Sequence, residues 1–281
     1  MDGDQLYQRA EARLKKWFSF GTTKFEEASE TFVRAANAYK LRKEWRKAGD
    51  AFSRAADCMK QCEGQEFEVG NHLASAATCY KKVDPSIAVT FYKSASDTFA
   101  SSGRFQTAAK HLKDAAESMK ADGEKQAAVE LFLEASHLFE SEEQSSSSHA
   151  CQTSAADLSA ELGNYVDAAK IYESIGLSVL DDRLRKFSAR EHFLKCILCF
   201  LASTDNVAAK DAFSKFNKSD SSFEQTREAD LCKALVEAVE EGDVEQLATA
   251  IFEYDSISKL DDWKTAVCLK IRENIESQGV V

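Results

Sequence analysis

Apolar residues recur along the chain at intervals of twenty residues. The recurring unit is a small residue, a large apolar residue four positions later and a further apolar residue three positions after that. Because positions i, i+4 and i+7 lie on one face of a helix, each unit predicts one amphipathic helix. Six units fit this pattern: Ala28/Phe32/Ala35, Ala48/Phe52/Ala55, Ala88/Tyr92/Ala95, Ala108/Leu112/Ala115, Ala128/Phe132/Ala135 and Ala168/Tyr172/Ile175.

Two weaker units and a series of glycines complete the repeat. Glycines at 103, 123 and 163 keep the twenty-residue step and stand where the predicted helices should end. Twenty residues therefore form a helix and a turn, and forty form a hairpin of tetratricopeptide type, in which small residues let neighbouring helices approach closely. The weaker units are Val69/Leu73/Ala76, displaced by one residue, and Ser148/Gln152/Ala155, which is polar.

The predicted fold class is all-α, a right-handed solenoid of tetratricopeptide-like helical hairpins with a helical bundle at its carboxy-terminal end. The repeat fades after residue 188, so the solenoid is assigned to 1–188, with an apolar loop at 15–22, and the bundle to 189–281. Such a bundle would cover the last apolar face of an open stack. The polar run E-S-E-E-Q-S-S-S-S-H at 140–149 predicts a loop between helices.

Composition supports helix and indicates a charge gradient. A single proline, Pro85, leaves helical hydrogen bonding almost uninterrupted. The net charge of −11 is uneven, about +4 over residues 1–60 and −8 over 224–281. So weak a basic segment does not indicate nucleic-acid binding, and protein partners are favoured. No apolar run approaches the ~20 residues of a membrane span, and the first residues lack the apolar core of a secretory signal. A cytosolic protein with reduced cysteines is therefore expected.

Candidate catalytic groups are sparse. C-I-L-C, with Cys196 and Cys199, has the spacing of zinc and redox sites, but it lies in an apolar run without a second suitably placed pair. Buried structural cysteines are the favoured interpretation there and at Cys58 and Cys62. The five histidines form no H-x-x-x-H pair, and no phosphate-binding glycine motif is present. The sequence predicts no catalytic residue, no metal site and no cofactor.

Two surfaces carry opposite charge. Basic residues cluster at 40–47 and continue at Lys81, Lys82, Arg104 and Lys110, which recur around successive hairpins and would form a basic stripe. The stripe is interpreted either as solvated helix faces or as a groove for an acidic partner. The run V-E-A-V-E-E-G-D-V-E, from Val236 to Glu245, leaves the same choice, a solvated face or a dock for a basic partner.

Five strings resemble the alpha type of the soluble NSF attachment protein family, in order and over essentially the whole chain. They are K-F-E-E-A-S-E-T-F-V-R-A-A-N-A-Y-K-L-R-K-E-W, C-Y-K-K-V-D-P, G-R-F-Q-T-A-A-K-H, L-R-K-F-S-A-R-E-H-F-L-K and E-Y-D-S-I-S-K-L-D-D-W-K-T. The resemblance implies an adaptor without enzymatic activity. Family members coat the four-helix SNARE bundle and recruit the hexameric ATPase NSF, which pulls the bundle apart.

The resemblance also implies residue roles. SNARE binding through the concave face is implied for Lys43, Lys81, Arg104, Lys110, Leu184 and Arg190. Ala150 stands where the family has a further lysine, so one contact is missing and Lys110 is expected to carry more of the binding. NSF binding is implied for Asp205, Glu237, Glu240 and Glu241, and for Val280, which takes the place of a terminal leucine, although the acidic stretch beside it is absent.

Three aromatic rings precede a glycine in K-K-W-F-S-F-G. By the residues alone, Trp17, Phe18 and Phe20 are interpreted as a hydrophobic clasp between the first two helices. By the resemblance, this loop dips into the bilayer, which suits aromatic rings flanked by lysines and implies peripheral membrane association of a cytoplasmic protein. Two other hypotheses remain open, a peptide-binding scaffold of tetratricopeptide type without an ATPase partner, and a metal or thiol enzyme using the cysteines of C-I-L-C.

Overall fold

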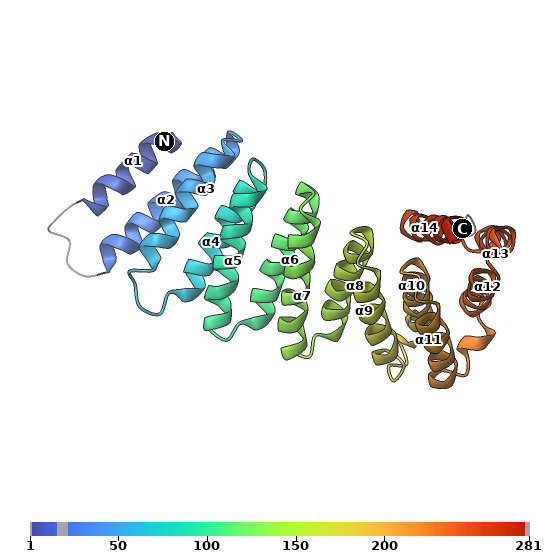
Figure 1. Ribbon diagram of the computed structural model, residues 1–281. Helices are drawn as coiled ribbons and strands as arrows, with labels where there is room; N and C mark the ends of the chain where they lie inside the picture. Colours follow the sequence, from blue (N-terminus) through green and yellow to red (C-terminus); the bar gives the residue numbers. More distant parts are fainter. Residues whose placement is uncertain (1, 16–21, 279–281) are drawn as a thin grey trace. The chain divides into compact units, whose positions relative to one another are not determined.

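The structure, a computed structural model, describes residues 2–15 and 22–278 (Figure 1). Trp17, Phe18, Phe20 and Val280 lie outside these ranges. Within them, the chain forms α-helices and two short 3-10 helices, without a strand. The α-helices are α1 (Gly3–Leu14), α2 (Thr23–Leu41), α3 (Trp45–Met59), α4 (Glu66–Tyr80), α5 (Pro85–Ser101), α6 (Phe105–Asp122), α7 (Lys125–Ser141), α8 (Ser145–Glu161), α9 (Tyr165–Ser178), α10 (Ala189–Ala202), α11 (Asn206–Ser219), α12 (Arg227–Glu241), α13 (Val244–Ile257) and α14 (Asp262–Gln278), with η1 (Lys186–Ser188) and η2 (Phe223–Gln225).

The twenty-residue repeat is confirmed from α2 to α9. These eight helices begin about twenty residues apart, and every member of the six regular triplets is buried. The displaced triplet is buried as well, with Val69 5% and Leu73 4% exposed. Alanines that are fully buried let the neighbouring helix backbone approach, while the larger residue of each triplet fills the space between. The all-α fold predicted from the period is therefore correct.

The chain divides into two compact units, Met1–Cys151 and Gln152–Val281, and the division falls inside α8. This division follows packing, whereas the predicted limit at residue 188 follows the regularity of the repeat. The assignment of 1–188 to the solenoid and 189–281 to the bundle stays a prediction.

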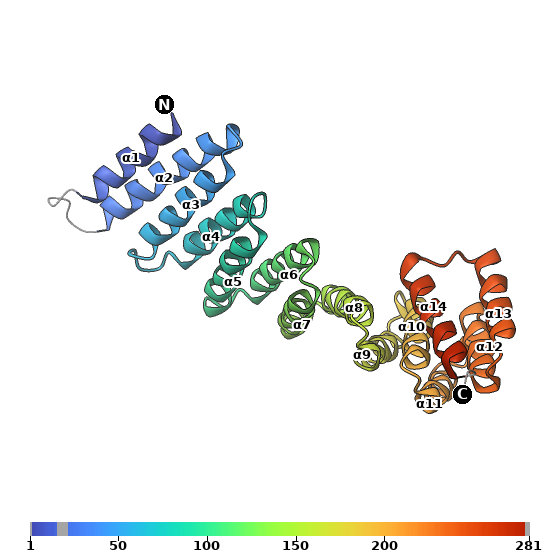
Figure 2. The same ribbon diagram turned by 45° about the horizontal axis from the view of Figure 1, so that its top comes forward.

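Turns in the first unit alternate between two opposite edges. From α1 to α7, each helix packs on the next one in the chain. The short connections make consecutive helices antiparallel, as Figures 1 and 2 show. The α2–α3, α4–α5 and α6–α7 turns therefore share one edge, and the α3–α4 and α5–α6 turns share the other. A helix of α5's length, 17 residues, spans roughly 25 Å, which is the distance between the edges.

Left-handed residues end the helices at the predicted step. Gly103, Gly123 and Gly163 have φ of 74°, 89° and 84°. Lys43 and Glu143 occupy the same slot of the repeat with φ of 60° and 55°, although neither is a glycine. At these five turns the left-handed conformation is thus adopted whether or not the residue is a glycine.

The predicted polar loop at 140–149 is largely wrong. α7 continues to Ser141, α8 begins at Ser145, and only 142–144 connect them. Ser148 is fully buried, and its hydroxyl donates to Glu140 Oε1 at 2.9 Å. Because this hydrogen bond satisfies the buried hydroxyl, a run of serines is accommodated inside a helix.

In the second unit, α10 is the central helix. Eleven of its fourteen residues are buried, and it packs against α9, α11, α12 and α14. A helix that is apolar all round belongs in a core, which explains the run C-I-L-C-F-L-A.

One polar junction joins four helices of this unit. Asp157 Oδ1, on α8, accepts hydrogen bonds from the Tyr172 hydroxyl of α9 at 2.5 Å and from Lys195 Nζ of α10 at 2.7 Å. The indole N–H of Trp263, on α14, donates to the backbone oxygen of Asp157 at 3.2 Å. Lys195, 8% exposed, also lies over the rings of Trp263 and Tyr172, with Nζ 4.6 Å and 5.4 Å from their centroids.

Candidate functional surfaces

Carboxylates neutralise most of the basic cluster at 40–47. Arg42 forms an ion pair with Asp2, Arg46 with Asp84 at 3.2 Å, and Lys47 with Glu44 at 3.0 Å and with Asp4 at 3.2 Å. Lys40 lies over the ring of Phe52, 5.7 Å from its centroid. Lys43 is exposed, and within the described residues no carboxylate pairs with it. Within the described residues the cluster therefore presents two cations without a carboxylate partner, Lys43 and Lys40, of which Lys40 is stacked on a ring.

Lys43 holds its position in a costly backbone conformation. Its φ of 60° lies in the left-handed region, which costs a residue with a side chain about 1–2 kcal/mol. The turn that imposes this φ is closed by the backbone N–H of Glu44, which donates to the carbonyl of Tyr39 at 3.0 Å. The repeat uses glycine in this slot at three other turns. A lysine here is consistent with a role for its charge rather than for the fold.

Two substitutions of Lys43 separate the charge from the backbone. We expect the free energy of unfolding of the Lys43→Gly variant to be about 1 kcal/mol higher than that of Lys43→Ala. Only the glycine adopts the left-handed conformation without strain. Both variants lose the same charge, so their affinities for an acidic partner should fall equally. Urea denaturation measures the first effect and a binding isotherm the second. Equal stability of the two variants would contradict the assignment of strain to this position.

The other predicted cations lie at both edges of the first unit. Lys81 follows α4 in the α4–α5 turn, at the same edge as Lys43. Arg104 stands before α6 in the α5–α6 turn, at the opposite edge, and Lys110 is in the second turn of α6. All three are exposed. The four cations therefore do not form a stripe along one edge but occupy both edges.

Arg104 has an aromatic neighbour. Its guanidinium lies over the ring of Phe67 at 4.5 Å from the centroid, and Phe67 is 44% exposed. Stacking on the ring holds the cation without neutralising it. The charge remains available to an acidic partner.

Leu184 and Arg190 belong to the second unit, close to η1. Leu184 is 91% exposed and Phe187 64%, so two large apolar side chains face solvent within four residues. Arg190 Nε donates to the backbone oxygen of Phe187 at 3.0 Å, and its guanidinium lies 5.6 Å from the centre of that ring. Sequence reasoning named Leu184 and Arg190 but missed Phe187, for which the string L-R-K-F gave no signal of exposure.

The predicted acidic residues divide into two kinds. Asp205 caps α11, where its carboxylate accepts from the N–H of Ala208 at 3.0 Å, and Glu240 forms an ion pair with Lys210. Both therefore have a part in the fold. Glu237 and Glu241 are exposed, and in the part of the chain that the structure describes neither has a cation partner. These two carboxylates are the ones free to attract a basic surface.

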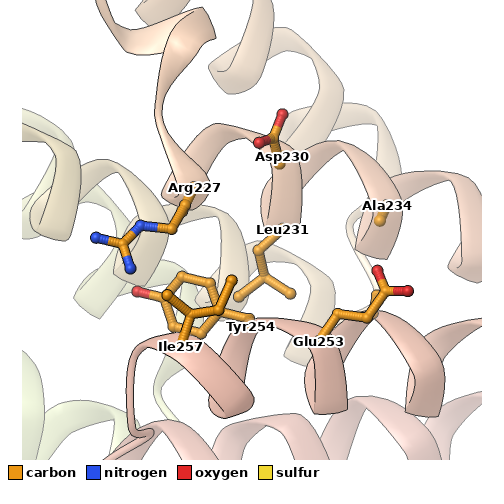
Figure 3. Close-up of a pocket in the computed structure, with 8 residues that line it drawn as sticks. Arg227, Asp230, Leu231, Ala234, Glu253, Tyr254 and Ile257 are labelled. Atoms are coloured by element: carbon orange, nitrogen blue, oxygen red, sulfur yellow. The ribbon is translucent and has the colours of Figure 1, made fainter.

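A pocket opens between α12, the helix that carries these carboxylates, and α13 (Figure 3). It has a volume of about 190 Å³, and Leu231, Ala234, Ala250, Tyr254 and Ile257 line it with apolar surface. Arg227, Asp230 and Glu253 supply the charged groups of the lining. Sequence reasoning missed this site, although the spacing of Asp230, Ala234, Glu237 and Glu241 at i, i+4, i+7 and i+11 places them along one face of α12.

The cysteines are buried as predicted. All eight are buried, and Cys196 and Cys199 are fully enclosed in the core of the second unit. Burial raises the pKa of both thiols, which disfavours the thiolate that metal binding and redox exchange require. Across the described residues, no group of three or more His, Cys, Asp or Glu side chains could hold a metal ion.

Two further observations concern the predicted surfaces. Ala150, where a lysine was expected, is exposed on α8. In the described ranges, none of the helices has the length and apolar character needed to cross a bilayer.

Comparison with known proteins gives one consistent result. The model of the family "Soluble NSF attachment protein, SNAP" matches residues 1–276. The beta-soluble NSF attachment protein of Bos taurus is 36% identical, with 98% of this chain and 94% of that protein covered. The alpha-soluble NSF attachment protein of Saccharomyces cerevisiae is 35% identical, with 99% and 98% covered, and that of Homo sapiens is 35% identical, with 96% and 94% covered.

Proposed function

Since the chain belongs to the family of soluble NSF attachment proteins, we propose that it is an adaptor that binds SNARE complexes and recruits and stimulates NSF. The reaction served is the disassembly of SNARE bundles in vesicle fusion and intracellular protein transport. The chain itself carries out no chemistry in this proposal. It supplies the binding surfaces for both partners, and through it the force of the ATPase reaches the bundle.

The observation that carries the SNARE-binding role is the set of cations left without carboxylate partners. Lys43, Lys81 and Lys110 are exposed and unpaired within the described residues, and Arg104 is stacked but not neutralised. Neighbouring lysines and arginines are paired with Asp2, Asp4 and Asp84 instead. An acidic rod would therefore meet cations at both edges of the first unit. Two helices side by side, each about 10–12 Å across, match the roughly 25 Å between these edges.

The second unit supplies the contact with NSF in this proposal. Glu237 and Glu241 face solvent without cation partners, and Asp205 and Glu240 lie in the same unit. Acidic groups of this kind attract a basic partner and orient it during encounter. Leu184 and Arg190 add an apolar and a cationic contact for the SNARE bundle.

A reconstituted disassembly reaction tests the proposal. Purified SNARE complex, NSF and ATP are incubated with and without this protein, and release of labelled SNARE chains is followed by fluorescence. Disassembly should depend on the added protein. If NSF disassembles the complex no faster in its presence, the adaptor role is wrong and a peptide-binding scaffold without an ATPase partner takes its place.

We also propose that the loop at 15–22 contacts the membrane surface through Trp17, Phe18 and Phe20. A Phe18→Ser, Phe20→Ser variant should then disassemble membrane-anchored SNARE complexes several-fold more slowly while its rate on soluble complexes stays unchanged, because the rings add affinity only where lipid is present. The same reconstituted reaction, run with liposomes and in solution, measures both rates. An equal loss on the two substrates, or a fall in the free energy of unfolding, would favour the clasp between helices.

A further inference from the structure

The α12–α13 pocket lies on the face that is proposed to meet NSF. Asp230 and Ala234 line it, and they share one face of α12 with Glu237 and Glu241. The pocket therefore stands at one end of a row of carboxylates rather than apart from it. This arrangement is expected where one side chain of the partner inserts into the apolar pocket. Other residues of the partner would interact with the carboxylates only through their charge.

The size of the pocket limits what it can hold. At about 190 Å³ it is smaller than the roughly 300–1,000 Å³ of sites for small molecules and cofactors. It has room for several water molecules, and thus for one long side chain. Its apolar lining comes from buried Leu231 and Tyr254 and from Ile257, which is 69% exposed. An exposed isoleucine at the opening of a pocket is a surface that gains from being covered.

The charges of the pocket indicate which side chain fits. Asp230 on α12 and Glu253 on α13 supply the two carboxylates of the lining, one from each helix, as Figure 3 shows. Within the described residues neither carboxylate has an ion-pair partner. Arg227 is the one cation of the lining, and its Nη1 donates to Ser258 Oγ at 2.9 Å. Its guanidinium points away from both carboxylates in this view, so the opening is negative.

We propose that this pocket receives a lysine or arginine side chain of NSF. The aliphatic stem would lie on Leu231, Tyr254 and Ile257, and the cationic head would lie between Asp230 and Glu253. A carboxylate is disfavoured as the occupant, because the two acidic groups of the lining outnumber the single positive charge of Arg227. The inference rests on the proposed function, since it names NSF as the partner that carries the basic side chain.

The test uses the full chain bound to SNARE complexes, with retention of purified NSF as the readout. An Asp230→Asn, Glu253→Gln variant keeps the shapes of both side chains and removes both charges. We expect its affinity for NSF to fall about ten-fold, with SNARE binding unchanged. The matched control is Asp211→Asn, Asp262→Asn, which removes two exposed carboxylates of the same unit outside the pocket.

A second variant separates insertion from long-range attraction. Ala234→Leu fills the hollow without changing charge, so it should also weaken NSF retention while circular dichroism and urea unfolding confirm that it folds. Full retention by Ala234→Leu, or an equal loss in the matched control, would overturn the pocket assignment. If the unmodified chain on SNARE complexes fails to retain NSF at all, the proposed function itself is wrong, and this outcome is distinct from the first two.

Discussion

A Lys43→Glu, Lys110→Glu variant is expected to lose on the order of 100-fold in affinity for the SNARE complex. Each reversal replaces an attraction of up to about 1 kcal/mol with a repulsion of similar size, and 1.4 kcal/mol corresponds to ten-fold. Both lysines are exposed and unpaired within the described residues, so their replacement breaks no ion pair of the fold. The loss should therefore appear in binding and not in stability.

Pulldown with immobilised SNARE complex, or a titration with labelled complex, measures this loss. The control is Lys93→Glu, Lys120→Glu, which makes the same change in net charge at two other exposed lysines of the first unit. The difference between the two variants should shrink as salt is raised, because exposed charges are screened within about 8–10 Å. Full binding by the Lys43/Lys110 variant would refute the assignment of these cations to the SNARE surface.

An Asp157→Ala variant is expected to lose about 3 kcal/mol of unfolding free energy. Lys195, 8% exposed, would keep its charge in the core of the second unit after losing the carboxylate that it contacts at 2.7 Å. Breaking a buried ion pair from one side typically costs 3–5 kcal/mol, and Asp157 itself is partly exposed, so the lower value applies. Urea denaturation followed by circular dichroism measures the change.

Tyr172→Phe is the matched variant for this junction. It removes one hydrogen bond to Asp157 and leaves the Lys195 pair in place, so it should cost only about 1–2 kcal/mol. The prediction of a charge-dominated junction fails if the two variants are equally stable. A larger loss of stability in Asp157→Ala than in Tyr172→Phe would identify Asp157 as the residue whose contacts hold α8 and α9 against α10 and α14.

The helices could be predicted from the sequence because the repeat marks the residues that must be buried. Ala28, Phe32 and Ala35 recur in kind every twenty residues, and a face that is apolar at i, i+4 and i+7 has to be covered. The prediction of a loop at the serine-rich run was wrong because burial there depends on a hydrogen-bond partner in another helix. Ser148 is buried only because Glu140, on the preceding helix, accepts its hydroxyl, and a composition of polar residues does not reveal that partner.

The sequence names individual residues for the candidate surfaces, whose roles stay predictions, but it does not show how these residues are arranged. The period of twenty residues is half of the forty-residue hairpin, so turns at successive repeats fall alternately on opposite edges. Lys81 and Arg104 lie in successive turns and therefore at opposite edges, which their spacing in the sequence does not reveal. The isolation of Lys43 depends on carboxylates distant in the chain, such as Asp2 and Asp84, that pair with its neighbours. The pocket between α12 and α13 required the helices to be placed before Asp230 and Glu253 could be seen as a pair.

The alternation of turns between two edges also has a mechanical consequence. A helical bundle that is bound along a single line can turn about that line. A force applied to it then rotates the whole bundle and does not separate its helices. Cations at both edges of the first unit, roughly 25 Å apart, give a lever arm that opposes rolling. A bundle held at both edges would therefore resist turning as a whole, so force from the ATPase would act to separate its helices.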